Sequence, residues 1–439
     1  MESLLIVGGR VIDPASGFDG PADVAVRDGR VVAIGPSLSR SGVDRVIDAT
    51  DRLVTPGLID PHVHLREPGG EHKETLATGS LAAVAGGFTT VCCMPNTTPA
   101  LDSPELLEFV RARAAATAAC RVFPVAAATR GRKGEEPAEI GLLARAGAVG
   151  FSDDGDCIPT AGMMLRVLHA VSVTGLAFMQ HCQDPTLTKG AAMHAGDVAT
   201  RLGLGGWPRV AEEVIIERDV RLLRGVPGAR YHVQHISSGE SVDLVRKARA
   251  AGLAVTAEAS PHHLLLTHRE CEGYNTAAKV NPPLREDRDV EAVRQGVADG
   301  TITVLATDHA PHSADEKRLP FEEAPFGMVG LETALPLYAE ALVHTGLISW
   351  PRLIALMTIE PAKLCNLDRE GLGMLRVGGP ADITVIDPEA EWTITHESLR
   401  GRSSNSPFLG RSVRGRAVAT IVNGRVVMEL NSARAAAIA

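Results

Sequence analysis

Between roughly residues 56 and 370, short apolar segments alternate with longer segments rich in alanine, leucine, arginine and glutamate. Short apolar runs are typical of buried strands and the longer segments of helices, so the alternation predicts repeated βα units around a parallel sheet. Eight candidate strands in about 315 residues favour a closed (β/α)8 barrel of the α/β class over an open sheet. They are LIDPHVHL, FTTVCCMP, CRVFPVAA, GAVGFS, LAFMQHC, YHVQHIS, LAVTAEAS and TITVLATD.

Both ends of the chain are rich in β-branched residues and turn signals. Residues 3–55 contain short runs with Gly-Arg and Asp-Gly turns, and AVATIVNGRVVMEL near the C-terminus contains an Asn-Gly turn. We expect the two ends to pair into one small composite β-sandwich. Residues 1–55 and 371–439 would then form a domain beside a catalytic barrel of residues 56–370. The final segment, NSARAAAIA, is expected to fray or to form a short helix.

Composition excludes several classes of protein. The chain of 439 residues carries a net charge of -9 from interspersed residues of both signs, without the basic block that binds nucleic acid. Its first residues, MESLLIVGGRVIDPASG, lack the basic flank and long apolar run of a signal peptide, and no apolar run of about 18 residues follows, so we expect a cytoplasmic protein without a membrane partner. Seven cysteines without a C-x-x-C pair are expected to be buried small hydrophobes. No glycine pattern matches a nucleotide-binding loop.

A pair of histidines stands at the end of the first candidate strand. His62 and His64 are two residues apart, so on a strand both imidazoles point to the same face and can share one metal ion. The alternative is two packed or exposed histidines without a metal. The rest of the sequence weighs against that alternative.

Further histidines and carboxylates lie at the ends of later candidate strands, namely Asp154, His181, His235 and Asp308. In a (β/α)8 barrel these ends converge on the C-terminal mouth, where such enzymes keep their active sites. Neutral imidazoles and carboxylate oxygens suit Zn²⁺ without any thiolate. Four histidines and two carboxylates are enough for two metal ions bridged by a carboxylate and a water molecule.

Other histidines are assigned no metal. His232 precedes His235 by an odd number of residues, so on a regular strand it should point away from the barrel interior and be packed or hydrogen-bonded. His262 and His263 lie where they can line the mouth of the seventh strand, but a structural role is favoured. No function is assigned to His72, His169, His194, His268, His344 or His396.

The ordered motifs HVHLREPGGEHKE, CCMPNTTP, GFSDDGD, HCQD, HVQHIS, EASPHHL, KVNPPLR and ATDHAPH together resemble those of the class I bacterial dihydroorotases of the amidohydrolase superfamily. The resemblance covers roughly residues 3–428. The HxH motif alone indicates only the superfamily, whereas HLREPG followed by MPNT and NPPLR points to the cyclic-amide hydrolases and to this family. It implies that His62 and His64 hold one zinc ion with Asp308, and that His181 and His235 hold a second.

The resemblance also implies an acidic residue on the fourth strand that bridges the two zinc ions. Hydantoinases, allantoinases and some dihydroorotases use a carboxylated lysine there, but GFSDDGD contains no lysine. The family pattern selects Asp154, the second aspartate, and leaves Asp153 in a turn. Adjacent side chains on a strand point to opposite faces, so only one of the two should reach the metals.

The implied activity is the reversible, zinc-dependent cyclisation of N-carbamoyl-L-aspartate to (S)-dihydroorotate plus water, in the biosynthesis of pyrimidines (UMP). Zinc lowers the pKa of bound water from 15.7 to about 7 and polarises the amide carbonyl. Asp308 would take the proton from the hydroxide and return it to the ring nitrogen.

The substrate carboxylate needs a matching cation, and the guanidinium of Arg66 fits it with two hydrogen bonds. The alternative for Arg66 is a surface salt bridge with Glu67 or Glu71. Asn96 equally fits a cap on the helix after the second strand. The residues that the resemblance assigns to substrate are His64, Arg66, Asn96, His312, Asn281 and the backbone of Phe326 and Gly327.

Two other functions compete with this hypothesis. A hydantoinase or allantoinase is disfavoured by the missing lysine and by the set of Arg66, Asn96 and His312. A non-catalytic homologue that partners aspartate transcarbamoylase is disfavoured because such proteins lose metal ligands, whereas all six are present here. The sequence leaves open a homodimer, a complex with the transcarbamoylase, and whether one metal or two are bound.

Overall fold

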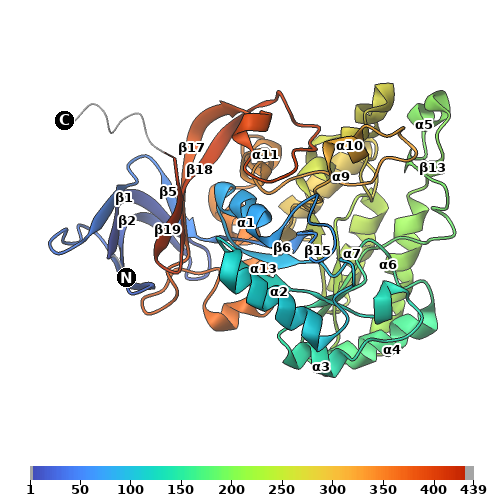
Figure 1. Cartoon of the computed structure of the whole chain (residues 1–439), viewed down its shortest axis with the longest axis horizontal. Helices are drawn as coiled ribbons and strands as arrows, with labels where there is room; N and C mark the ends of the chain where they lie inside the picture. The colour runs from blue at the N-terminus through green and yellow to red at the C-terminus, as the bar shows by residue number, and fades with distance from the viewer. Residues whose placement is uncertain (1–2, 431–439) are drawn as a thin grey trace.

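The computed structural model describes residues 3–430, and the final segment NSARAAAIA lies outside the described residues. Figure 1 shows a sheet at one end of the molecule, built from the two ends of the chain, beside a larger body of strands and surrounding helices. Within residues 3–430, no helix combines the length and the apolar character that crossing a membrane requires.

Parallel strands form the centre of the larger body. Each pairs with its neighbour in chain order, as six strands in one sheet and three in another. Only Val125 separates β8 from β9, and a parallel bridge links Val63, at the end of β6, to His309, which follows β16, so the two sheets approach each other at both edges. The strands are β6 (Leu58–Val63), β7 (Phe88–Cys93), β8 (Arg121–Pro124), β9 (Ala126–Ala127), β10 (Phe151–Ser152), β11 (Ala177–Gln180), β14 (Arg230–Val233), β15 (Val255–Ala259) and β16 (Val304–Leu305).

These strands match the eight predicted segments to within one residue, because β14 begins at Arg230, just before YHVQHIS, and β8 and β9 together form the third segment. The predicted α/β class with parallel strands is confirmed, and the arrangement is consistent with a barrel. Helices follow the strands and cover the outside. Thr75, Thr160 and Ser238 cap α1, α4 and α7 through their side chains, which satisfies backbone amides at the helix starts. The principal helices are α1 (Leu76–Ala85), α2 (Pro104–Thr117), α3 (Ile140–Arg145), α4 (Ala161–Ser172), α6 (Val210–Leu223), α7 (Gly239–Ala250), α9 (Asp287–Ala298), α11 (Ala334–Tyr338), α12 (Trp350–Met357) and α13 (Ile359–Leu364).

Short elements complete the loops around the barrel. An excursion after β11 contains a two-stranded parallel ribbon, and helical turns follow β15 and β16. They are η1 (Arg130–Arg132), β12 (Met193–His194), α5 (Asp197–Leu202), β13 (Gly206–Trp207), α8 (Pro261–Leu265), η2 (His268–Tyr274), η3 (Thr276–Ala278), α10 (Ala314–Lys317), η4 (Ala339–Val343), η5 (Leu367–Glu370) and η6 (His396–Ser398).

The second body is one sheet in the order β19-β18-β17-β5-β1-β2-β3, with β4 paired to β1. Antiparallel pairing of β5 with β17, at Val54 opposite Val385, joins the two ends of the chain. Val31 on the edge strand β3 and Ile421 on β18, next to the other edge, share one buried core, so the sheet curls over on itself. The strands are β1 (Leu4–Asp13), β2 (Phe18–Arg27), β3 (Arg30–Gly35), β4 (Arg45–Asp48), β5 (Leu53–Pro56), β17 (Ile383–Thr393), β18 (Ser412–Val422) and β19 (Arg425–Glu429).

All seven cysteines are buried and free, as predicted. The division of the chain into domains at residues 55 and 370 stays a prediction.

Candidate active site

The carboxyl ends of the barrel strands surround a cavity of about 330 Å³. Its position at this face follows from the parallel topology, because every strand ends at the same mouth. Most of the predicted site residues line it, and His62 lies just beneath. The lining residues are His64, Arg66, Asn96, Asp154, Gly155, His181, His235, Asn281, Asp308, Ala310, His312, Pro325, Phe326 and Gly327.

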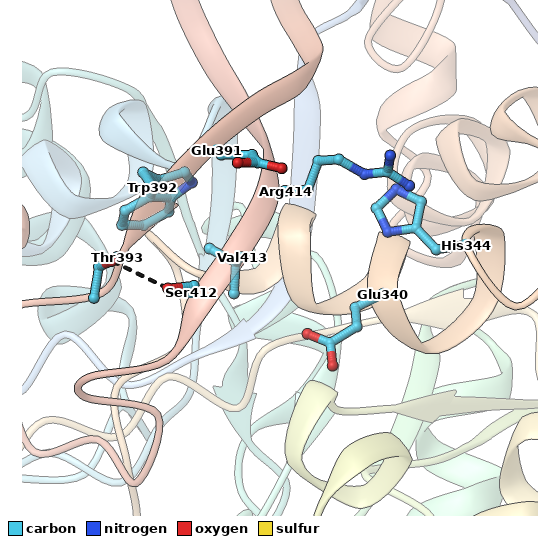
Figure 2. A pocket seen from close by; sticks show the side chains of 8 residues that line it. All are labelled: Glu340, His344, Glu391, Trp392, Thr393, Ser412, Val413 and Arg414. Carbon is cyan, nitrogen blue, oxygen red and sulfur yellow. Dashed lines mark hydrogen bonds between the residues drawn. The ribbon is translucent and has the colours of Figure 1, made fainter.

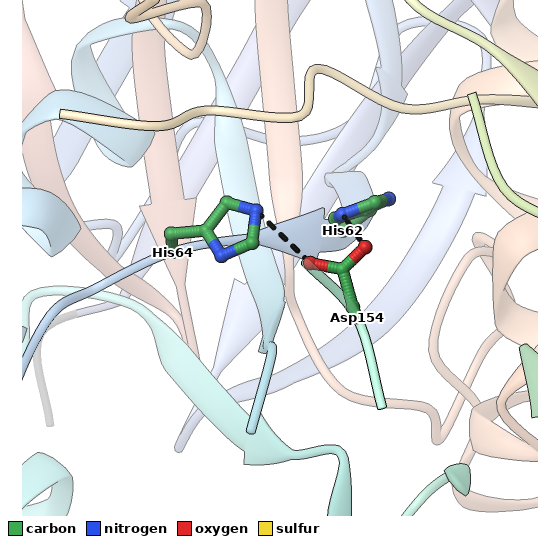
Figure 3. A group of neighbouring side chains, drawn as sticks. All are labelled: His62, His64 and Asp154. Carbon is green, nitrogen blue, oxygen red and sulfur yellow. Dashed lines mark ion pairs between the residues drawn. The ribbon is translucent and has the colours of Figure 1, made fainter. Parts of the chain in front are cut away.

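His62 and His64 converge on Asp154, as Figure 3 shows. The Nε2 atoms of His62 and His64 each lie 3.4 Å from a carboxylate oxygen of Asp154. His62 lies on β6 and is fully buried, and Asp154 follows β10 with 2% of its surface exposed. The ligand atoms of the three side chains are close enough to hold one metal ion.

A second group shares the same aspartate. His181 Nδ1 and His235 Nε2 each lie 3.6 Å from Oδ1 of Asp154, and they are 2.8 Å from each other. Asp154 therefore stands between two pairs of imidazoles, which is the arrangement of a carboxylate that bridges two metal ions. Two buried atoms aimed into the cluster, His62 Nε2 and Asp154 Oδ1, have no hydrogen-bond partner among the described residues, so the donor set fits metal ions.

Hydrogen bonds from the outer nitrogens fix how three of the imidazoles present themselves. His62 Nδ1 lies 2.5 Å from Glu258, His64 Nδ1 lies 2.8 Å from Asn96 Oδ1, and His181 Nε2 lies 2.7 Å from Gln183 Oε1. An oxygen at each outer nitrogen holds the proton there and leaves the inner nitrogen's lone pair free for a metal. This explains why Asn96 lines the site. Asn96 does not cap α2, which begins at Pro104 after Ser103.

Asp153 has a different environment from Asp154. Its carboxylate accepts hydrogen bonds from the backbone amides of Ala128 and Thr129, at 2.9 and 3.0 Å, and from the Thr129 hydroxyl. Burial raises the pKa of Asp153 despite these bonds. Its side chain thus joins β10 to the segment after β9 and is turned away from the histidines.

Asp308 lies at the mouth, after the last barrel strand. Its Oδ1 is 3.1 Å from His64 Nε2 and 3.5 Å from His62 Nε2, and its backbone has a positive φ of 50°. A positive φ is uncommon for an aspartate and points its side chain away from the direction expected on a regular strand. Asp308 therefore contacts the first histidine pair and also faces the cavity.

The charges around these residues favour a cation. Burial alone raises the pKa of Asp154, but the imidazoles around it, His62 first, outweigh burial and hold that pKa well below its usual range. Burial lowers the pKa of His64, which favours the neutral imidazole that binds metals. Burial also lowers the pKa of His62, yet Glu258 and Asp154 raise it well above its usual value. The carboxylates that favour a proton on His62 equally favour a metal cation.

Arg66 and His312 also line the cavity. Burial lowers the pKa of Arg66 to about 10, so the guanidinium keeps its charge at neutral pH. Burial, with Arg66 and Lys73 nearby, lowers the pKa of His312 to about 2, and its Nε2 lies 2.8 Å from the carbonyl of Phe326. Glu67 pairs with Arg113 at 2.7 Å, so the surface salt bridge considered for Arg66 does not form with Glu67.

Two buried lysines hold the loop that contains Phe326 and Gly327. The Nζ atom of Lys279 donates to the carbonyls of Phe321, Glu322 and Ala324, at 2.5 to 3.0 Å. Lys317 donates to Pro325 at 2.8 Å, and burial lowers its pKa to about 7. Asn281 Nδ2 donates to Gln183 Oε1 at 2.9 Å, and the Asn281 Oδ1 has no hydrogen-bond partner within residues 3–430.

Sequence reasoning missed Glu258. This carboxylate is fully buried on β15, lies 2.5 Å from His62 Nδ1 and lies 3.0 Å from His232 Nε2. A lone glutamate in the apolar segment LAVTAEAS was the available signal, because buried carboxylates require partners. The expectation that His232 points away from the barrel interior was wrong. β14 ends at Val233 and His235 has a positive φ of 26°, so strand alternation does not relate the two histidines.

A third group of possible ligands, His194, His268 and Glu286, lies outside this cavity. Arg285 Nη1 is 3.3 Å from His194 Nδ1, so His194 accepts there and carries its proton on Nε2, the nitrogen that faces Glu286. That proton disfavours a metal.

A larger hollow of about 510 Å³ lies beside η4 and the β17–β18 pair (Figure 2). It contains one histidine, His344, and no cluster of metal ligands among the described residues, so the smaller cavity carries the chemistry.

The fold and the donor set define a metal-dependent amidohydrolase. Residues 288–428 match the model of the "Amidohydrolase family", and residues 51–241 match a model described as "Dihydro-orotase-like". A dihydroorotase of Pelotomaculum thermopropionicum is 47% identical over 97% of this chain and 98% of its own length. One from Anaeromyxobacter sp. strain K is 48% identical over 98% of each chain. The chain belongs to the dihydroorotase family.

Solved structures with the same architecture include hydantoinases. The L-hydantoinase (dihydropyrimidinase) of Arthrobacter aurescens superimposes with a TM-score of 0.88 at 26% identity, covering 98% of this chain and 97% of its own. The D-hydantoinase (dihydropyrimidinase) of Thermus sp. gives 0.82 at 26% identity, with 97% and 95% covered. The barrel and its companion sheet are therefore shared by related cyclic-amide hydrolases, while the higher identity lies with dihydroorotases.

Proposed function

We propose that this chain is a dihydroorotase with two zinc ions, which converts N-carbamoyl-L-aspartate reversibly to L-dihydroorotate plus water in pyrimidine biosynthesis. One observation carries the proposal. Asp154 stands within 3.6 Å of four imidazole nitrogens in the cavity that also contains Arg66. A site for metals thus faces a site for a carboxylate, and dihydroorotate has both a ring amide and a carboxylate.

We assign the first zinc ion to His62, His64 and Asp308, the second to His181 and His235, and the bridge to Asp154. Two zinc ions would lower the pKa of water to near neutrality and polarise the amide carbonyl. Nitrogen and oxygen donors without thiolate suit zinc.

The remaining steps belong to side chains of the chain. Asp308 faces the cavity beside His64 and would accept a proton from the attacking water at a carboxylate oxygen. It would return that proton to the ring nitrogen as the amide bond breaks. In the biosynthetic direction the same carboxylate would take the proton from the carbamoyl nitrogen as the ring amide bond forms, and would give it to the oxygen that leaves as water.

Other residues that line the cavity would bind and orient the substrate. Arg66 presents a charged, half-buried guanidinium to the substrate carboxylate, assisted by Asn96 and His312. The Oδ1 of Asn281 and the backbone of Phe326 and Gly327 would hold the ring amide. Holding the ring at both ends brings its carbonyl to the cluster and excludes water from the reacting face.

The test is an assay of the purified, zinc-loaded protein with L-dihydroorotate, carbamoyl aspartate, hydantoin and allantoin. We expect turnover of dihydroorotate in both directions and weak or no turnover of the other rings. Faster hydrolysis of hydantoin or allantoin would refute the assignment. Absence of any turnover with full metal content would favour the non-catalytic partner of aspartate transcarbamoylase.

A homodimer and a complex with aspartate transcarbamoylase stay predictions, to be checked by light scattering with and without the transcarbamoylase. The cytoplasmic location likewise stays a prediction.

A further inference from the structure

A loop from the C-terminal part of the chain crosses the mouth of the barrel. Residues 400–408, between η6 and β18, form this mouth loop. The backbone amide of Arg402 lies 3.3 Å from both carboxylate oxygens of Glu74, and the Ser403 hydroxyl donates to the carbonyl of Lys73 at 2.7 Å. These contacts attach the mouth loop to the segment that precedes α1.

Asn405, in the middle of the mouth loop, bonds to two loops that line the cavity, one with Ala310 and His312 and the other with Gly327. Its Nδ2 donates to the carbonyls of Ala310, at 3.2 Å, and Gly327, at 3.1 Å. Its Oδ1 accepts the backbone amide of His312 at 2.9 Å. Its own carbonyl accepts the amide of Val329 at 2.9 Å. One side chain therefore uses its donor and acceptor groups on three residues that line or adjoin the cavity.

The two loops held by Asn405 already approach each other closely. Ala310 donates to the carbonyl of Met328 at 2.8 Å, and Gly327 has a φ of 124°, which favours glycine. A β-carbon at Gly327 would lie 2.6 Å from that of Ala310. Because the packing is this tight, a shift of either loop moves His312 and Gly327 relative to Asp308.

We propose that Asn405 is a positioning residue that sets the spacing between His312 and Gly327 and thereby the fit of the substrate's carboxylate and ring amide. The inference rests on the proposed function. No contact joins Asn405 to His62, His64, Asp154, His181 or His235 among the hydrogen bonds of residues 3–430, so its influence should fall on binding and not on the metals.

The test is steady-state kinetics of Asn405→Ala with L-dihydroorotate, together with zinc content. Losing three hydrogen bonds to groups that bind substrate equally before and during the reaction should raise KM by about tenfold or more. We expect kcat to change less than about threefold and zinc per chain to stay unchanged. Asn405→Asp keeps the acceptor for His312 but turns a carboxylate oxygen toward two carbonyls, so its KM should rise further.

Ser404→Ala is the matched control. Ser404 is the neighbouring residue and bonds to His396 at 2.8 Å at the surface. Among the side-chain hydrogen bonds of residues 3–430 it has none to either cavity loop, so the KM of Ser404→Ala should equal that of the unmodified protein. If Asn405→Ala does not fold, Asn405→Ser takes its place in the same assay.

The outcomes separate the two proposals. An unmodified protein that fails to turn over dihydroorotate refutes the proposed function. An active unmodified protein with normal KM in Asn405→Ala, even with a lower melting temperature, overturns the positioning role. A fall in zinc content or in kcat at constant KM overturns it as well.

Discussion

Replacing Asp154 and Asp153 in turn separates two neighbouring aspartates whose environments differ completely. In the described part of the chain, Asp154 is the one carboxylate that pairs with both sets of imidazoles, at 3.4 to 3.6 Å from four ring nitrogens. Asp153 instead accepts two backbone amides and a hydroxyl. We expect Asp154→Ala to lose bound zinc and nearly all turnover, and Asp153→Ala to keep its metal and a measurable rate.

The magnitudes follow from what each carboxylate contacts. Loss of a group that only orients a metal ligand costs about 10-fold to 100-fold in metal affinity, so loss of a shared direct ligand should exceed about 100-fold at both metals. Asp153→Ala leaves the buried amide of Thr129 without an acceptor, at about 1–3 kcal/mol, whereas the amide of Ala128 keeps a longer bond to the carbonyl of Ser152 at 3.3 Å. The free energy of unfolding should therefore fall by about 1–3 kcal/mol. Asp153→Asn keeps an oxygen for both amides and should be milder.

The assay is zinc per chain after dialysis, measured by atomic emission, beside kcat on dihydroorotate and urea unfolding. Asp154→Asn and Asp153→Asn form a pair matched in size and charge change. Metal loss from the Asp153 variants, with metal retained in the Asp154 variants, would show that Asp153 is the bridging residue. Retention of both metals in Asp154→Ala would refute the bridge and leave a mononuclear site on His62, His64 and Asp308.

Four further changes have defined outcomes. Asp308→Asn should fold normally by circular dichroism but lose about 100-fold to 10,000-fold in kcat, and near-normal turnover would move the proton transfer elsewhere. Glu258→Gln should weaken zinc affinity by about 10-fold to 100-fold, measured by competition with a chelator, because it loosens the proton on His62 Nδ1. Burial raises the pKa of Glu332 to about 7, above the value of 4.5 expected in the unfolded chain. The free energy of unfolding is therefore highest below about pH 4.5 and falls by up to about 3 kcal/mol as the pH rises through 7. Glu332→Gln should remove this pH dependence of the free energy of unfolding, measured with urea. Deleting residues 1–55 should destabilise the sheet formed with residues 371–439, and an unchanged melting temperature would contradict one composite domain.

The sequence by itself determined the barrel and most of the candidate metal site. Strand and helix periodicities are local, so eight apolar segments separated by helical ones specify the parallel units without knowledge of packing. The strand ends of such a barrel meet at one mouth, so the sequence alone predicts that His62, His181 and Asp308 lie close together. The choice of Asp154 over Asp153 came from family resemblance and not from periodicity.

Only the tertiary structure decided which way several side chains of the site point, because alternation along a strand does not determine this. The side chain of Asp153 turns away from the histidines because its carboxylate accepts hydrogen bonds from the backbone amides of Ala128 and Thr129, which lie in the segment after β9. β14 ends at Val233 and His235 has a positive φ, which is why the orientation predicted for His232 failed. A positive φ at Asp308 likewise interrupts the two-residue repeat after β16. Asn405 reaches the mouth from a loop that no local pattern connects to the barrel. Hydrogen bonds between distant segments depend on how the backbone packs, and that information is spread over the whole chain.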